Sequence, residues 1–193
     1  MPGRFFLTRE AAGMADAPRY NIAPGQEVIT LTSDGAQHMR WGMIPVGRVN
    51  ARGRPVMETI VNARSETVFD KSAFADVKRA VVPVEGWYEW TGERRRKQPW
   101  RISRKDGELL YFAAIYDIWH GPGGIEVSQV ATITCAPSAD VRDIHHRMGV
   151  ILNADQVDLW FSSDEATAKS MMQPYPDGML HVEKADDVDW DGA

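Results

Sequence analysis

The sequence predicts an α+β fold: one domain built on a mostly antiparallel, barrel-like sheet with short helices. Three observations lead to this prediction. Strand-like segments dominate the chain, Asp-Gly turns separate several of them, and helix-capping signals mark only two short stretches. The 193 residues are 44% hydrophobic and 25% charged, which provides enough apolar material for one core. We expect a single domain over residues 1–185, followed by a frayed acidic tail over residues 186–193.

Two Asp-Gly turns predict pairs of strands. Residues 27–45 form one pair around Asp34-Gly35, and residues 99–119 form the other around Asp106-Gly107. Asp-Gly readily adopts the positive φ angles that a tight hairpin needs, so each pair is predicted to be a hairpin. Residues 125–135 (IEVSQVATITC) alternate and are rich in β-branched side chains, which predicts a further strand.

Two short helices have capping signals. Ser72 precedes the stretch AFADVKRA, and Asn153 precedes ADQVDLWF. Ser and Asn side chains can accept the free N–H groups of a first helical turn, so each stretch is expected to begin a helix there.

Composition excludes several classes of protein. No apolar run approaches the ~20 residues of a membrane helix, so no membrane partner is expected. The first residues lack the apolar core of a signal peptide, which predicts a cytoplasmic location. Cys135 is the single cysteine, so an intrachain disulfide and a multi-cysteine metal site are both excluded.

The net charge of −5 is unevenly distributed. Residues 40–105 contain 15 Lys and Arg against 7 Asp and Glu, whereas the flanking segments are acidic. The basic middle is consistent with a local contact surface for a polyanion. On charge alone, a solvated charged surface remains the simpler interpretation.

The stretch TIVNARSET contains Asn62, Arg64 and Glu66 at alternating positions. In an extended chain these side chains would lie on one face, offering an amide, a cation and an acid to one ligand. The alternative is a structural ion pair between Arg64 and Glu66.

The stretch VVPVEGWYEW places Glu89 between bulky aromatic side chains. Partial desolvation raises the pKa of a carboxyl group and suits it to proton transfer near neutrality. Aromatic neighbours could stack on unpaired bases, at roughly 1–3 kcal/mol each. The alternative is that the tryptophans belong to the core and Glu89 has a structural partner.

The stretch IHHRMGVIL contains adjacent histidines, whose side chains titrate near pH 7. Neighbouring histidines point in different directions and no HExxH spacing occurs, so no metal site and no cofactor are expected. A cysteine nucleophile at Cys135 is disfavoured, because the end of an apolar strand typically holds cysteine as a small buried hydrophobe.

Together these motifs resemble the SOS-response-associated peptidase (SRAP) family of abasic-site processing proteins. The resemblance runs from the start to about Trp160. Its motifs, in chain order, are GRF, RYNIAPGQ, RWGMIP, NARSET, VPVEGWYEW, KQPW, FAAIYDIW and IHHRM.

The resemblance implies a ligand and a chemistry. Family members attack the aldehyde of an abasic site in single-stranded DNA with a cysteine exposed by loss of the initiator methionine. The product is a stable thiazolidine crosslink. The implied catalytic positions are Pro2, Asn62, Glu89 and His145. The implied DNA-binding positions are Arg4, Trp41, Arg64, Trp90 and Arg147. We expect a monomer that acts on single-stranded DNA containing abasic sites and associates with the nucleoid after DNA damage.

Pro2 departs from the family pattern, because it stands where the nucleophilic cysteine is expected. Without a thiol no thiazolidine can close. Three interpretations follow: the Pro2 secondary amine forms a labile iminium, the chain is a non-catalytic DNA-binding module, or Pro2 replaces a native cysteine by engineering. The family's peptidase description adds a further alternative, self-processing at the N-terminus. Gly149 and Ala80 are smaller departures, at positions where proline and cysteine are usual.

Overall fold

Five strands form a closed ring in the computed structural model, which describes residues 2–45, 52, 59–71, 74, 76–93 and 96–191. Neighbouring strands pair in the order β10-β4-β3-β6-β9, and β9 pairs back onto β10 to close the barrel. Only the β4–β10 contact of this ring is parallel. The strands span β3 (Glu27–Thr32), β4 (Gly35–Trp41), β6 (Lys78–Val84), β9 (Leu110–His120) and β10 (Glu126–Cys135).

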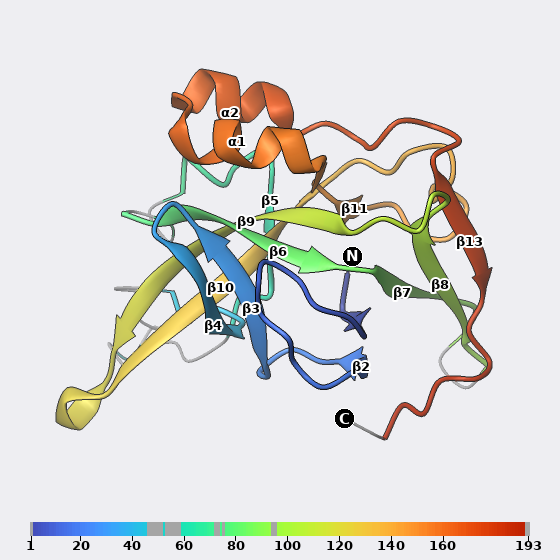
Figure 1. Ribbon diagram of the computed structural model, residues 1–193, viewed down its shortest axis with the longest axis horizontal. Helices are drawn as coiled ribbons and strands as arrows, with labels where there is room; N and C mark the ends of the chain where they lie inside the picture. The colour runs from blue at the N-terminus through green and yellow to red at the C-terminus, as the bar shows by residue number, and fades with distance from the viewer. Residues whose placement is uncertain are drawn as a thin grey trace.

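A second, five-stranded antiparallel sheet lies beside the barrel (Figure 1). Its order is β13-β8-β7-β1-β2. The strands span β1 (Arg4–Leu7), β2 (Arg19–Ile22), β7 (Gly86–Thr91), β8 (Gln98–Arg104) and β13 (Leu180–Lys184). This sheet positions the start of the chain, because β1 pairs directly with β7.

The chain passes from the barrel into the second sheet at Glu85 and Gly86, between β6 and β7. A Cβ atom at Gly86 would lie 2.3 Å from the carbonyl oxygen of Ile102 and 2.8 Å from the Phe6 ring. Glycine is therefore required where these backbones approach. Glu85 ties the junction to the end of β1, since its Oε2 accepts hydrogen bonds from the Thr8 backbone N–H at 2.5 Å and the Thr8 hydroxyl at 2.7 Å.

Short elements complete the fold. β5 (Asn62–Arg64) runs parallel to β10, β11 (Met148–Gly149) pairs with β10, and β12 (Ile151–Leu152) pairs with β9. The helical elements are η2 (Pro122–Gly124), η3 (Ala154–Gln156), α1 (Val157–Ser162) and α2 (Glu165–Met171). A helical segment does begin after Asn153, as predicted, but its first turn is 3-10. The predicted cap Ser72 lies outside the described residues.

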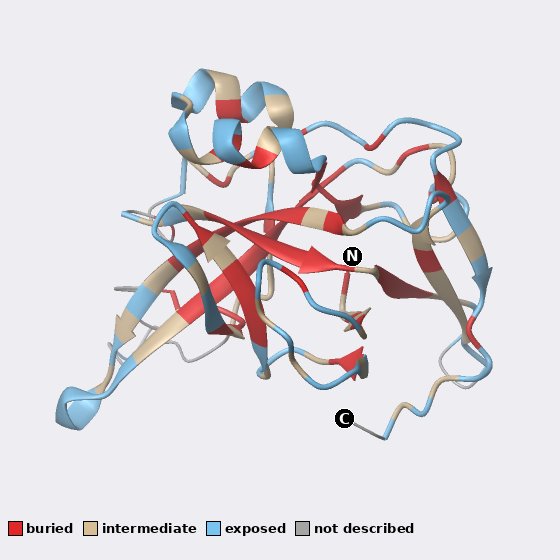
Figure 2. Cartoon of the chain, in the orientation of Figure 1, coloured by how far each residue is buried: buried red, intermediate tan, exposed pale blue. Residues whose placement is uncertain are grey.

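The core lies where β6, β9 and β10 meet, and Figure 2 shows these strands buried over much of their length. Trp87 and Phe112 pack edge to face at 5.6 Å between ring centroids. Trp160 of α1 is fully buried and donates its indole N–H to the Ala80 carbonyl at 2.9 Å.

The predicted fold class is confirmed, and so is the hairpin at Asp34-Gly35, which joins β3 to β4. The hairpin predicted at Asp106-Gly107 is wrong. Strands are present on both sides of that turn, but β8 pairs with β7 and β13, whereas β9 pairs with β6, β10 and β12. The turn therefore carries the chain from one sheet to the other, a distinction that local turn chemistry does not encode.

The prediction of a frayed acidic tail is also wrong for residues 186–191. Asp186 accepts a hydrogen bond from Gln98, Asp187 pairs with Arg101, and the Trp190 ring packs on the second sheet. Among the described residues, no helix is long and apolar enough to cross a membrane.

Candidate active site at the start of the chain

The start of the chain is held by a side-chain amide from β5, the short strand that pairs with β10 of the barrel. Asn62 Nδ2 donates a hydrogen bond to the Pro2 carbonyl oxygen at 2.8 Å. Asn62 Oδ1 in turn accepts a hydrogen bond from the Thr132 hydroxyl at 2.5 Å, and these two residues are register partners on β5 and β10. Thr132 thus orients the amide so that its N–H points at the backbone of a buried Pro2.

Glu89 lies on β7 and is 3% exposed. Since Arg4 pairs with Tyr88, continuing the antiparallel register by one residue places Glu89 opposite Gly3. Burial raises the pKa of the Glu89 carboxyl above its ordinary value, and the positive charge of the amino terminus acts in the opposite direction. The carboxyl group therefore holds its proton to a higher pH than an exposed glutamate, which suits a proton donor.

The charge at the start of the chain also affects the pKa of His145. Burial lowers the pKa of its imidazole, and the charge of the amino terminus lowers it further. The Arg147 backbone N–H lies 3.0 Å from His145 Nδ1. The His146 ring stacks on the His145 ring at 4.4 Å between centroids and adds to the lowering of the pKa. A neutral imidazole at pH 7 can accept a proton.

Asn62 and Glu89 are therefore brought to the start of the chain by a hydrogen bond and by strand register, and His145 is linked to it by the effect of the amino-terminal charge on its pKa. Asn62 contacts Pro2 directly, while Glu89 and His145 lie within electrostatic range of the amino terminus. Their catalytic roles stay predictions. A raised pKa on Glu89 suits a proton donor and a lowered pKa on His145 suits a proton acceptor.

Arg147 has a structural partner. Its guanidinium forms a bidentate pair with Glu66, at 2.5 Å and 2.9 Å, and donates to the Thr134 carbonyl at 2.5 Å. Its side chain is 14% exposed, so the guanidinium is committed to these oxygens rather than presented to a phosphate. Hydrogen bonding to Arg147 lowers the pKa of Glu66 to about 2. The clamp fixes the loop that carries His145.

The predicted alternation of Asn62, Arg64 and Glu66 on one extended face is correct only for the first two. β5 ends at Arg64, and Glu66 lies in the turn that follows. The alternative pair between Arg64 and Glu66 does not form, because Arg147 takes the carboxylate. Arg64 is exposed, which leaves its predicted phosphate contact as a prediction.

Arg4 lies half-buried on β1, and its Nη1 donates to Asn21 Oδ1 at 2.5 Å. Its predicted phosphate contact also stays a prediction. Trp90 is half-buried on β7, and its ring centroid lies 5.1 Å from that of Trp190. The predicted stacking surface of Trp90 is therefore partly occupied by the chain's own last segment.

The prediction that Trp41 stacks on DNA is wrong. Trp41 is 0% exposed, its ring packs on Phe5 at 4.3 Å between centroids, and its indole N–H donates to the Val61 carbonyl at 3.2 Å. The ring is part of the core that holds β1 against the barrel, so no base can reach its face.

Cys135 lies at the end of β10 and is buried, and burial raises the pKa of its thiol to about 12. A thiol that stays protonated at neutral pH is a poor nucleophile, which agrees with its expected role as a small hydrophobe.

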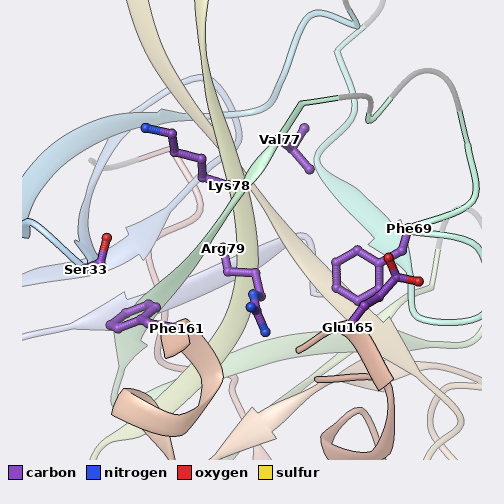
Figure 3. A pocket seen from close by; sticks show the side chains of 7 residues that line it. All are labelled: Ser33, Phe69, Val77, Lys78, Arg79, Phe161 and Glu165. Atoms are coloured by element: carbon purple, nitrogen blue, oxygen red, sulfur yellow. The ribbon is translucent and has the colours of Figure 1, made fainter. Parts of the chain in front are cut away.

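A separate pocket of about 370 Å³ lies between β6 and the helices (Figure 3). Arg79 extends into it between Phe161 and Glu165, and its guanidinium is held by the hydroxyl and the carbonyl of Ser163. This pocket contains none of the predicted site residues.

Sequence reasoning missed two supporting residues. Thr132 carries the Asn62 amide, and His146 covers one face of His145. A polar residue inside the apolar run ATITC is the signal that could have identified Thr132. The pairing of β5 with β10, which brings the two residues together, is a long-range contact that no local pattern reports.

The chain is similar in sequence to several proteins of known name. The chain is 34% identical over 169 residues to "Abasic site processing protein YoqW" of Bacillus subtilis, covering 82% of this chain and 74% of that protein. It is 30% identical over 154 residues to "Abasic site processing protein YedK" of Escherichia coli, covering 76% and 65%. It is 31% identical over 159 residues to "Abasic site processing protein HMCES" of Gallus gallus, covering 70% and 47%.

Solved structures share the fold. A crystal structure of a protein from Bacteroides thetaiotaomicron superposes with a TM-score of 0.76 at 27% identity, over 87% of this chain and 78% of that one. A second, from Bordetella bronchiseptica, gives 0.75 at 24% identity over 90% of each chain. The profile of the family described as "SOS response associated peptidase (SRAP)" matches residues 3–188, and this chain belongs to that family.

Proposed function

We propose that this protein processes abasic sites in single-stranded DNA, and that it engages the lesion through the nitrogen of Pro2 as a labile iminium. The observation that carries the proposal is the hydrogen bond from Asn62 to the Pro2 carbonyl, which anchors residue 2. The raised pKa of Glu89 and the lowered pKa of His145 support their assignment as proton donor and proton acceptor. The named relatives, which are abasic site processing proteins, support the choice of ligand.

The chemistry requires residue 2 to be the free terminus. The secondary amine of Pro2 adds to the C1′ aldehyde of the opened sugar and forms a carbinolamine. Loss of water then gives an iminium, and addition of water reverses it. Glu89 supplies the proton that leaves with the water, and neutral His145 accepts the proton that the amine gives up.

The iminium sets the next step. It acidifies the C2′ hydrogen, so removal of that proton expels the 3′ phosphate by β-elimination. Water then releases the unsaturated aldehyde and regenerates the amine. The proposed activity is therefore that of a lyase or a transient crosslinker. Pro2 has no thiol to close a thiazolidine, so the permanent crosslink implied by the family chemistry is absent.

Trapping on matched oligonucleotides tests this function. Intact-mass spectrometry first establishes that Met1 is absent from the purified protein. The protein is then incubated with single-stranded and duplex oligonucleotides carrying one abasic site, with and without borohydride. We expect an adduct that depends on borohydride and forms preferentially on the single strand.

Other outcomes would change the assignment. Binding of the abasic strand without any trapped adduct would show that the protein binds this DNA non-covalently and is not a lyase. A preference for the duplex would contradict the choice of single-stranded DNA.

A further inference from the structure

The last described residues of the chain cover one face of the five-stranded sheet. We call residues 186–191 the C-terminal strap. Alternation along β7 puts Tyr88 and Trp90 on the face opposite to Trp87 and Glu89. Figure 1 shows the chain leaving β13 at the edge of this sheet and turning back toward β2.

Oxygen atoms of the strap accept hydrogen bonds from three side chains of the sheet: Arg101 and Asn21 lie on this face, and Gln98 is the first residue of β8. Asp187 accepts two hydrogen bonds from Arg101 Nη2, at 2.9 Å and 3.1 Å. Asp186 accepts one from Gln98 Nε2 at 2.8 Å. The backbone carbonyl of Asp189 accepts one from Asn21 Nδ2 at 3.0 Å. The amide of Asn21 is the group that also accepts from Arg4.

The aromatic side chain of the strap packs against the rings of the same face. Trp190 packs on Tyr88 in a T-shaped arrangement at 5.0 Å between centroids, and on Trp90 at 5.1 Å. The Arg101 guanidinium lies over the Tyr88 ring at 6.0 Å and over the Phe6 ring at 5.9 Å. Cations and stacking rings are thus interleaved, and Tyr20 at the margin is 61% exposed.

We propose that this face, built around Arg101, Tyr88 and Trp90, is a contact surface for single-stranded DNA, and that the C-terminal strap occupies it as a displaceable acidic cover. Four of the six strap residues are aspartates, and the strap also carries Trp190. Carboxylates on a guanidinium and an indole on aromatic rings match the two contacts that a single strand makes, phosphate to arginine and base to ring. The inference rests on the proposed function, because it takes the ligand from there.

The strap is built to be displaced. It has no strand or helix, so side-chain contacts and single hydrogen bonds hold it instead of a backbone ladder. A cavity of about 690 Å³ remains between the strap and the sheet, lined by strap residues Asp187, Val188 and Asp189 and by sheet residues that include Phe6 and Tyr88. Incomplete packing and exposed aspartates lower the free energy needed to lift it.

Full-length variants test the cover. Asp187→Asn combined with Trp190→Ala removes its main ionic and aromatic contacts. Asp158→Asn on α1 is the control, because this exposed aspartate changes the net charge by the same amount outside the strap and the sheet it covers. Binding of an undamaged, labelled single strand is measured by fluorescence anisotropy at several salt concentrations.

A surface that is open about one-tenth of the time binds about tenfold more weakly than a permanently open one. We therefore expect the double variant to gain on the order of tenfold in affinity, whereas Asp158→Asn changes little. The slope of log affinity against log salt should steepen by about 0.7 for each phosphate newly contacted. Adding Arg101→Gln to the double variant should remove most of the gain.

The two proposals fail in different ways. Unchanged affinity of the double variant, while borohydride trapping on the abasic strand persists, would overturn the cover and leave the function intact. A gain that Arg101→Gln does not reduce would overturn the assignment of this face. A tenfold gain without any trapped adduct would keep the contact surface and overturn the iminium.

Discussion

Asn62 donates its side-chain amide to the Pro2 carbonyl oxygen at 2.8 Å, across 60 residues of sequence. The amide is oriented by Thr132, which stands opposite it in the parallel pair of β5 and β10. Because β5 pairs with β10 of the barrel, this contact anchors the start of the chain to the barrel. Residue 2 is therefore positioned by the core.

Asn62→Asp should lower the yield of borohydride-trapped adduct by about tenfold. The carboxylate keeps the size of the amide but cannot donate to the Pro2 carbonyl, and loss of one positioning hydrogen bond of ~1–2 kcal/mol corresponds to about tenfold in rate. Thr132→Val, which leaves the amide in place but unoriented, should have a smaller effect. Equal trapping by wild type and Asn62→Asp would show that the anchor has no role in the chemistry.

Glu89→Gln should slow trapping by about 100-fold, the lower end of what a positioned acid contributes. The wild-type rate should fall as pH rises through the raised pKa of Glu89, because the carboxyl then loses the proton it donates. The variant should lack that fall. Initial rates of adduct formation against pH measure both effects, with Glu93→Gln, an exposed residue beyond the end of β7, as the control.

Glu89→Gln should also increase the free energy of unfolding at neutral pH. The folded-state pKa of Glu89 is raised, so the native state binds more protons than the unfolded state between the ordinary value of 4.5 and the raised one. Stability therefore falls as pH rises through that window, by up to about 1.4 kcal/mol for each pH unit it spans. Urea unfolding from pH 4 to 8 measures it, and a variant less stable than wild type at neutral pH contradicts it.

Glu66→Gln should destabilise the protein by about 1 kcal/mol, a value that allows for solvent screening of the half-exposed carboxylate. Pairing with Arg147 lowers the pKa of Glu66 to about 2, so this contribution is present above about 4.5 and is lost as pH falls toward 2. Urea unfolding across that range should show a shallower acid loss in the variant. Glu108→Gln, an exposed control, should behave as wild type. If Glu66→Gln lost stability in acid to the same extent as wild type, the pair between Glu66 and Arg147 would not contribute to stability.

Local patterns predicted much of the fold. The Asp34-Gly35 turn and the alternating run over residues 125–135 are elements whose signals lie within a few residues, and both are present. The turn at Asp106-Gly107 has the same chemistry but joins two sheets, because strand pairing is decided by long-range packing.

The candidate site was also predicted only in part from the sequence. Asn62, Glu89 and His145 could be singled out from short motifs; the structure places Asn62 against Pro2, and the amino-terminal charge contributes to the pKa of Glu89 and of His145. The error at Trp41 has a physical reason: a tryptophan at the end of a strand can stack on a ligand or fill a core, and only its contact with Phe5 decides. The acidic end carried no signal of docking, because the partners Arg101 and Tyr88 lie far away in sequence.

Comparison of wild type with Pro2→Cys on one abasic single-stranded oligonucleotide is the most direct test of the iminium at Pro2. Both proteins, with loss of Met1 verified by intact mass, are incubated with the strand, heated and resolved on a denaturing gel with and without borohydride. We expect a heat-stable adduct without reductant for Pro2→Cys, and for wild type an adduct only when borohydride is present. A heat-stable wild-type adduct without reductant, or no wild-type adduct under either condition while Pro2→Cys crosslinks, would contradict the proposed iminium at Pro2.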